Sequence, residues 1–244
     1  MVQNYNLQVS TGIDGLDRIL KGIIPGDNIV WQVGTAEDYQ LFIEPYVQFA
    51  LGRGKDLIYF RFARHAPLVQ AAPGVQMIEL NPEEGFEAFV DGVHSVIRRN
   101  RRGSYYVFDC LSDLAQYWYS DQMLGNFFML TCPYLLDVEA IAYFALYRNF
   151  HSFHATAPIL ETTQIFSEVY RHGGKIYIQP VKVLHRYSPT MYMLHVWEGD
   201  HFLPVTQSAT ISDVLTSVPW LQLSSSEYRS EEHTSELQSH SGIS

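Results

Sequence analysis

Basic side chains gather where the sequence predicts the end of a strand. The segment "RFARHAP" carries Arg61, Arg64 and His65 directly after an apolar run. Ligands of open α/β sheets bind beyond the carboxyl ends of strands, and guanidinium groups at that edge suit an anion. The three residues are therefore candidates for an anion or interface site, with ordinary surface salt bridges as the alternative.

Other catalytic or metal chemistry has little support. In "HSFH", His151 and His154 have a spacing that could place two metal ligands on a helix. No cysteine or acidic residue joins them nearby, so packing or capping roles are favoured and no metal site is expected. Cys110 and Cys132 lack metal-motif spacing and do not make a disulfide framework. The sequence also has no glycine-x-serine-x-glycine elbow and no paired catalytic carboxylates.

The composition argues against several classes of protein. Of 244 residues, 47% are hydrophobic and 17% are charged, which predicts a large packed core. The formal net charge of −10 argues against a nucleic-acid partner, because phosphate binding needs clustered lysine and arginine. The basic run "RRNRR" is typical of a helix end. No apolar run reaches the roughly 18 residues of a membrane span, and the N-terminus does not read as a signal peptide. A cytoplasmic location without membrane association is expected.

The elements that must position these side chains alternate between strands and helices. Apolar runs predict strands over residues 28–34, 56–62, 75–80, 105–110 and 140–147. An amphipathic helical pattern covers 82–100, and a largely helical segment covers 111–136. This alternation predicts an α/β fold with a mostly parallel sheet and helices on both faces. Further on, Gly173-Gly174 and Gly199-Asp200 each interrupt two extended runs, which predicts C-terminal antiparallel strands in two hairpins.

The stretch "VGTAEDYQLF", residues 33–42, lies between the first predicted strand and an apolar helical segment. A nucleotide-binding protein carries its phosphate-binding loop at this place. Gly34 could be the first glycine of such a loop, but the lysine and hydroxyl that should follow are missing. Pro45 leaves two alternatives, a helix from near Asp38 with an internal proline that kinks it, or a later helix that begins at Pro45.

The segment before this turn carries a resemblance to a known family. "VSTGIDGLDRILKGIIPGDNIVWQVG" resembles the opening of KaiC-like and RecA-like ATPase domains, and the resemblance extends over about residues 9–190. The matching residues are Ser10, Thr11, Gly12, Gly15, Leu16, Asp17, Leu20, Gly22, Pro25 and Gly26. "YYVFDCLSDL" would place Asp109 at the carboxylate of the Walker B strand. Lys182 and Arg186 would lie near basic residues that reach a neighbouring subunit's nucleotide, although their spacing departs from lysine-x-arginine.

The residues that would bind and hydrolyse ATP are replaced. Counted from Gly34, the positions of the second glycine, the lysine and the hydroxyl hold unrelated residues. The vestigial nucleotide-site positions are Gly34, Tyr39, Gln40, Leu41 and Asp109. Glu37 and Asp38 put carboxylates where phosphate would sit, and like charges about 4 Å apart cost on the order of 1 kcal/mol in water. We therefore expect no catalytic residue and no cofactor.

The last segment, "RSEEHTSELQSHSGIS" (229–244), differs from the rest because it is polar and has no aromatic residue. It matches the in-frame translation of a common short-read sequencing adapter. Residues 229–244 are therefore expected to be a disordered artefact, and the natural gene is expected to continue beyond Tyr228.

The expected function follows from these losses. Residues 1–228 are expected to form a single degenerate KaiC/RecA-like domain, a pseudo-ATPase with a regulatory or assembly role. Details such as "YFRFARH" and "RYSPTM" resemble an N-terminal module of bacterial phosphoenolpyruvate synthase or pyruvate, phosphate dikinase-like proteins. This implies a fragment of a larger phosphotransferase, with downstream catalytic domains or self-association as its partners. The alternatives are an active NTPase that binds ATP and Mg²⁺ through non-standard residues, and a ring-forming oligomerisation module.

Overall fold

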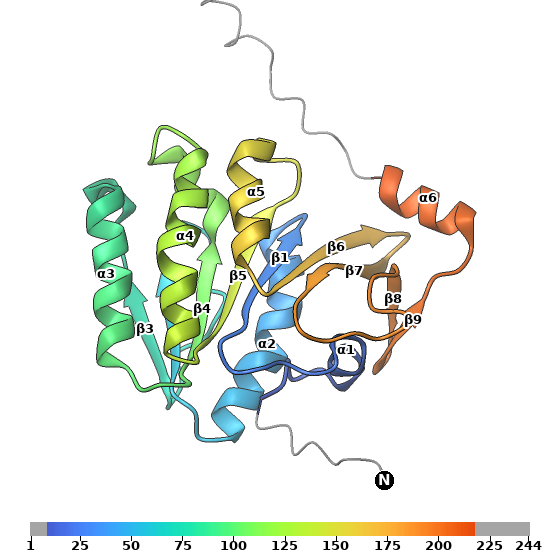
Figure 1. Ribbon diagram of the computed structural model, residues 1–244, viewed down its shortest axis with the longest axis horizontal. Coiled ribbons are helices and arrows are strands. Elements are labelled where there is room, and N and C mark those ends of the chain that lie inside the picture. Colours follow the sequence, from blue (N-terminus) through green and yellow to red (C-terminus); the bar gives the residue numbers. More distant parts are fainter. Residues whose placement is uncertain (1–8, 218–244) are drawn as a thin grey trace, which may run out of the picture.

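A computed structural model describes residues 9–217, which form a nine-stranded mixed sheet with helices packed on it (Figure 1). The elements are α1 (Asp14–Leu20), β1 (Asn28–Val33), α2 (Ala36–Gly52), β2 (Leu57–Arg61), β3 (Val75–Glu79), η1 (Pro82–Glu84), α3 (Phe86–Arg99), β4 (Tyr105–Cys110), η2 (Leu111–Gln116), α4 (Gln122–Asp137), β5 (Ile141–Tyr147), α5 (Phe153–Thr162), β6 (Ile165–His172), β7 (Lys175–Val183), β8 (His195–Glu198), β9 (His201–Pro204) and α6 (Ser208–Thr216). The predictions for the tail and for the gene beyond Tyr228 lie outside the described residues.

The sheet has the order β3-β2-β4-β5-β1-β6-β7-β8-β9. Strands β1 to β6 are parallel to one another, and β7, β8 and β9 extend the sheet with antiparallel pairs. The prediction of an α/β fold with a mostly parallel sheet and C-terminal antiparallel strands is confirmed. The first five predicted strands agree with the structure to within one residue at each end. Both predicted hairpins form, at Gly173-Gly174 and at Gly199-Asp200.

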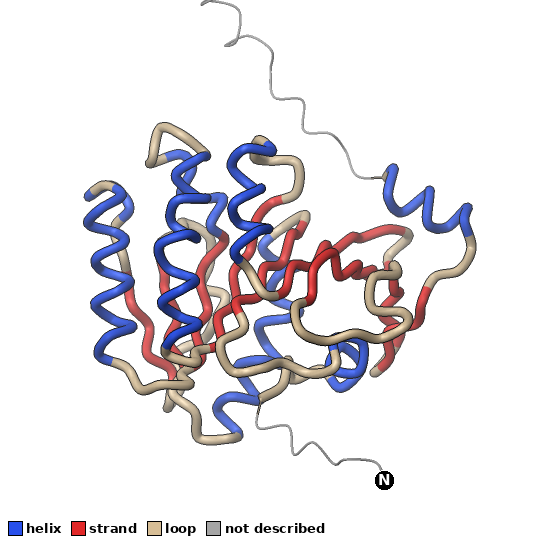
Figure 2. The backbone as a smooth tube through the Cα atoms, in the orientation of Figure 1, coloured by secondary structure: helices blue, strands red, loops and turns tan. Residues whose placement is uncertain are grey.

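Helices cover both faces of the sheet. In Figures 1 and 2, α3, α4 and α5 lie on one face, and α2 lies on the other. Alternate residues of β1 enter the two cores: Ile29 and Trp31 pack in the cluster that contains α1 and α2, whereas Val30 packs in the cluster that contains α3 and α4. Because the central parallel strands are buried on both faces, they appear in the sequence as continuous apolar runs. None of the helices in residues 9–217 is long and apolar enough to cross a membrane.

Two predicted helices are each interrupted in the structure, and these predictions are corrected. The helix expected over 82–100 is divided into η1 and α3 at Gly85, whose φ of 99° favours glycine. The segment expected to be helical over 111–136 is divided into η2 and α4, and Tyr119 lies between them with a φ of 54°. The helix after β1 begins at Ala36 and contains Pro45 inside it, so the alternative that begins the helix at Pro45 is wrong.

The segment directly before α1, residues 10–12, packs against α1 and α2. The carboxylate of Asp17 accepts the Thr11 backbone N–H at 2.9 Å, the Thr11 hydroxyl at 2.8 Å and the Ser10 hydroxyl. Burial raises the pKa of Asp17, and these hydrogen bonds act in the opposite direction. Gly12 approaches α2 so closely that a Cβ atom there would lie 2.1 Å from the Pro45 carbonyl oxygen. Ser10, Thr11, Gly12 and Asp17 therefore have direct roles in packing the segment before α1 on the rest of the fold.

Candidate functional site

The carboxyl edge of the parallel strands contains a fully buried carboxylate, Asp109, near the end of β4. Its Oδ2 accepts the Arg61 guanidinium and the backbone N–H groups of Phe62 and Ala63, each at 2.9 Å. Its Oδ1 accepts the Tyr59 hydroxyl. An ionised carboxylate has about four lone-pair sites, and four protein donors already occupy this one. Three of these donors are on Oδ2 and one is on Oδ1, so a metal–nucleotide complex would have to compete with the chain's own hydrogen bonds to Asp109.

The candidate anion residues at and after the end of β2 differ in their partners and in their exposure. Arg61 is bound to Asp109 and also donates to the His65 carbonyl oxygen, so its charge is neutralised within the chain. The His65 Nε2 atom lies 3.9 Å from Asp109 Oδ1 and 3.8 Å from Asp113 Oδ2. Arg64 is exposed and lies outside this cluster. The structure thus brings Arg61, His65 and Asp109 together, but as an internally paired group.

The turn after β1 has only two residues between strand and helix, Gly34 and Thr35. Thr35 caps α2, since its hydroxyl accepts the Asp38 N–H at 3.3 Å. The backbone N–H of Glu37 and the Thr35 hydroxyl lower the pKa of the Glu37 carboxyl. A phosphate-binding loop needs several successive N–H groups that surround the anion. This turn is too short for that arrangement, and the chain supplies its own carboxylates to the start of the helix.

A second buried carboxylate lies beside this turn. Asp38 Oδ1 accepts two N–H groups of Arg171, from Nε at 2.9 Å and from Nη2 at 2.6 Å. The Asp38 side chain is 5% exposed, whereas that of Arg171 is 54% exposed. The pair links the first turn of α2 to the end of β6. A cation is thereby placed beside the turn that follows β1, but it is already paired.

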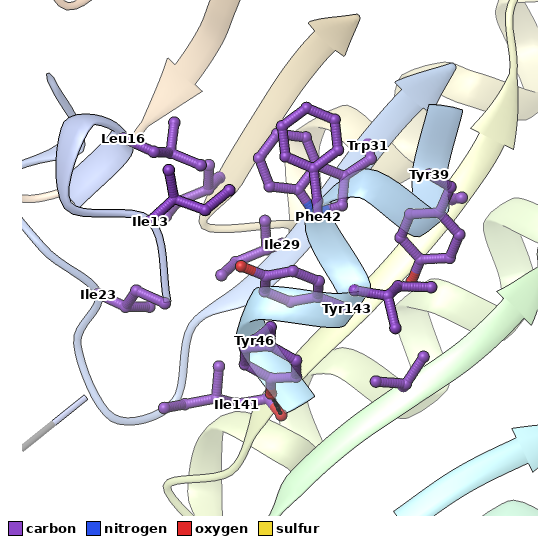
Figure 3. Close-up of a cluster of buried hydrophobic side chains, with 14 of the residues drawn as sticks. Ile13, Leu16, Ile23, Ile29, Trp31, Tyr39, Phe42, Tyr46, Ile141 and Tyr143 are labelled. Atoms are coloured by element: carbon purple, nitrogen blue, oxygen red, sulfur yellow. Dashed lines mark hydrogen bonds between the residues drawn. The ribbon is translucent and has the colours of Figure 1, made fainter. Parts of the chain in front are cut away.

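The expected vestigial nucleotide-site positions Tyr39, Gln40 and Leu41 all lie inside α2. Tyr39 is fully buried and points into the core between α2 and the sheet (Figure 3). Burial raises the pKa of its hydroxyl well above the ordinary value. Gln40 donates from Nε2 to Glu44 Oε1 at 2.8 Å, one turn along the helix, and Leu41 packs on the core. These side chains have taken the ordinary roles of an amphipathic helix.

The two basic residues of the closing hairpin segment lie near the opposite, amino-terminal edge of the parallel strands. Lys182 Nζ donates to the carbonyl oxygens of Leu160 and Glu161, each at 2.8 Å, near the end of α5. Arg186 Nη2 donates to Asp27 Oδ2 at 2.8 Å, and both side chains are almost completely buried. Asp27 directly precedes β1. Within the chain, both cations therefore serve intramolecular contacts.

The sequence did not reveal a polar pair that joins the ends of β4 and β5. His151 Nε2 lies 2.7 Å from Ser112 Oγ, which also accepts the Tyr147 N–H at 2.8 Å. Burial lowers the pKa of His151 to about 4, so the ring is neutral at pH 7. Ser112 is only 1% exposed, which denies a substrate access to its hydroxyl. The "HSFH" pattern favours a packing or capping role for His151 over a metal ligand, but it does not indicate the observed partner, a hydroxyl 39 residues away.

Taken together, fold and site define an α/β protein whose carboxyl edge is occupied by internally paired charges. In the part of the chain that the structure describes, no three His, Cys, Asp or Glu side chains are arranged to hold a metal ion. No protein-family model matches the chain, and no curated protein matches it significantly.

Proposed function

We propose that this chain is a degenerate KaiC/RecA-like domain that has lost ATP binding and acts as a regulatory or assembly module. The proposal rests on the opening motif, and on the positions of the two segments that would form a nucleotide site. Gly34 follows β1, and Asp109 lies near the end of β4, with only β5 between these parallel strands. The carboxyl edge of such strands is where an α/β protein binds its ligand.

The proposal rests most directly on the hydrogen bonds that Asp109 accepts from the chain itself. To coordinate a metal through Oδ2, this carboxylate would have to give up hydrogen bonds from the Arg61 guanidinium and two backbone N–H groups, and through Oδ1 it would have to share the oxygen that accepts the Tyr59 hydroxyl. Removal of one partner from a buried ion pair costs about 3–5 kcal/mol. The short turn at Gly34 offers no compensating phosphate contacts. The arrangement therefore favours a permanently closed edge over a nucleotide site.

The regulatory or assembly role is supported by aromatic side chains on two loops beyond the carboxyl edge. Tyr119 follows η2 and is completely exposed, and Phe150 and Phe153 follow β5, with Phe153 76% exposed. The two loops contact each other, since Asp121 Oδ2 accepts the Ser152 N–H at 2.8 Å. Aromatic residues are enriched in protein interfaces. The downstream domains of a phosphoenolpyruvate synthase or pyruvate, phosphate dikinase-like phosphotransferase are the partners that the sequence resemblance suggests.

A titration with MgATP, followed by thermal unfolding, tests the loss of nucleotide binding. A ligand at 100 times its Kd stabilises a folded protein by about 2.7 kcal/mol, which produces a clear shift in Tm. We expect no saturable shift. A saturable shift that Asp109→Ala abolishes, and that Asp91→Ala leaves intact, would instead establish an active nucleotide site. Asp91 is a suitable control because it is an exposed acid on α3.

Sedimentation velocity over a range of concentrations tests the competing ring-forming function. Discrete oligomers that Tyr119→Ser and Phe153→Ser dissociate would place self-association on the aromatic loops. A monomer at every concentration would rule out a ring-forming module.

A further inference from the structure

A groove with a volume of about 580 Å³ opens between α1, the middle of α2 and the β8–β9 hairpin. It is lined by the turn before α1, by Arg18, by Pro45 and by residues of the hairpin from Trp197 to His201. Asp109 and Gly34 do not line it, so it is separate from the carboxyl-edge site. Small-molecule sites have volumes of about 300–1,000 Å³, and this groove falls within that range.

Two close backbone contacts hold the walls of the groove in place. A Cβ atom at Gly12 would lie 2.1 Å from the Pro45 carbonyl oxygen, and one at Gly15 would lie 2.6 Å from the Asp200 carbonyl oxygen. The start of α1 is thus packed directly on the backbone of α2 and on the hairpin turn. A groove between elements in such close contact exists before any ligand binds.

One wall is aromatic. The Trp197 ring stacks on Phe202, with centroids 5.0 Å apart, and it lies 5.7 Å from Phe42 of α2. The indole N–H of Trp197 donates to the Gly199 carbonyl oxygen at 2.9 Å, which fixes the ring orientation.

The charges of the groove are unbalanced. Asp14 and Asp200 are exposed carboxylates, and neither forms an ion pair within residues 9–217. Among the described lining residues, the single cation is Arg18, and its Nη2 lies 3.4 Å from His201 Nδ1. With His201 neutral, the lining carries +1 from Arg18 and −2 from the two aspartates, a net charge of −1. A preformed pocket with an aromatic wall and excess negative charge is complementary to a positively charged organic molecule.

We propose that this groove binds a small organic cation, with its ammonium or guanidinium group near Asp14 and Asp200 and its apolar body against Trp197. This site is separate from the carboxyl edge, so the proposal does not depend on whether ATP binding has been lost. A ligand here would contact α1, α2 and the hairpin together, and would stabilise the packing of the opening segment on the rest of the fold.

Ligand-observed NMR titration of the folded chain at low salt tests the proposal with three probes of similar shape. Benzylammonium is cationic, benzyl alcohol is neutral and benzoate is anionic. We expect saturable binding of benzylammonium, at least tenfold weaker binding of benzyl alcohol and no binding of benzoate. At about 0.3 kcal/mol per non-hydrogen atom, the value typical of larger ligands, benzylammonium would bind with a Kd of about 20 mM, so the titration should extend through that range.

The variant Asp14→Asn/Asp200→Asn identifies the site. Each carboxylate close to a cation in water contributes about a fivefold gain in affinity, so removal of both should weaken benzylammonium binding about 25-fold. Asp91→Asn, an exposed acid on α3, is the matched control and should leave the affinity unchanged. Because Asp14 and Asp200 are exposed, the double variant should fold normally, which circular dichroism can verify. Unsaturable binding, equal binding of benzyl alcohol, or unchanged affinity in the double variant would each overturn the proposal.

Discussion

Arg171 donates two N–H groups to a single oxygen of Asp38, at 2.9 and 2.6 Å, beside the turn where a phosphate-binding loop would lie. The two partners are not equivalent, because the carboxylate is buried and the guanidinium is half-exposed. If the pair is broken from the Asp38 side, the remaining cation can be hydrated. If it is broken from the Arg171 side, a buried charge remains without its partner.

This asymmetry predicts that Arg171→Ala is more harmful than Asp38→Asn. An unsatisfied buried polar group costs about 1–3 kcal/mol, so Arg171→Ala should lower the free energy of unfolding by that amount. Asp38→Asn keeps an acceptor oxygen and releases an arginine that water can reach, so its cost should be about 1 kcal/mol or less. Urea denaturation of both variants measures the difference. An equal or larger loss in Asp38→Asn would contradict the interpretation of Asp38 as the buried partner.

Asp109→Ala should be the most damaging single change at the carboxyl edge. It leaves the Arg61 guanidinium, the Tyr59 hydroxyl and two backbone N–H groups without their acceptor. We expect the free energy of unfolding to fall by about 3–5 kcal/mol. The exposed Asp91→Ala should change it by no more than about 0.5 kcal/mol. If Asp109→Ala unfolds in urea like the wild type, the carboxylate does not hold the loop after β2.

The strands could be predicted from the sequence because parallel strands buried on both faces leave continuous apolar runs, as in "NIVWQV" and "YYVFDC". The ion pairs Arg61–Asp109 and Asp38–Arg171 could not be predicted from the sequence. Arg61 and Asp109 are 48 residues apart, and Asp38 and Arg171 are 133 residues apart. Local periodicity does not specify which distant side chains meet across a sheet. The sequence predicts separate roles for them, Arg61 in an anion or interface site and Asp109 as a vestigial nucleotide-site position.

The position of the helix after β1 shows a second limit of sequence reasoning. Counted from Gly34, Tyr39, Gln40 and Leu41 stand at the positions of the second glycine, the lysine and the hydroxyl, and Pro45 leaves two possible starts for the helix. In the structure, Thr35 caps the helix at once, and Tyr39 enters the core. The threonine cap was readable from "GTAED" as a helix start.

The buried ring of His151 predicts a specific pH dependence. Its pKa is about 4 in the folded chain, below the ordinary value of 6.5. Between these values the unfolded chain binds the proton more readily, so the free energy of unfolding should fall as the pH is lowered from about 7 to about 4. At 1.36 kcal/mol per pKa unit, the contribution is at most about 3 kcal/mol.

His151→Gln isolates this contribution, because other buried groups titrate equally in both proteins. Burial raises the pKa values of Asp17, Asp27 and Asp113, and these groups change the stability in the opposite direction over the acidic range. As the pH falls from about 7 to about 4, the free energy of unfolding of the wild type, measured by denaturation at several pH values, should therefore fall by up to about 3 kcal/mol more than that of His151→Gln. Parallel pH profiles would show that His151 is not protected from protonation.

The glycine of the opening motif offers the last prediction, because the chain contains a control with the same backbone conformation. Gly12 has a φ of 79° and Gly174 has a φ of 75°, so alanine is strained at both positions. A left-handed conformation costs a non-glycine residue about 1–2 kcal/mol. At Gly174 no atom lies within 4 Å of the added Cβ, whereas at Gly12 the Pro45 carbonyl oxygen lies 2.1 Å away. Gly174→Ala should therefore lose only the conformational contribution, and Gly12→Ala should lose at least about 2 kcal/mol more, because the start of α1 must move away from α2. Thermal unfolding of both variants measures this difference. Equal losses would mean that the motif glycine is needed only for its backbone angle, and that the close packing of the opening segment on α2 contributes nothing to stability.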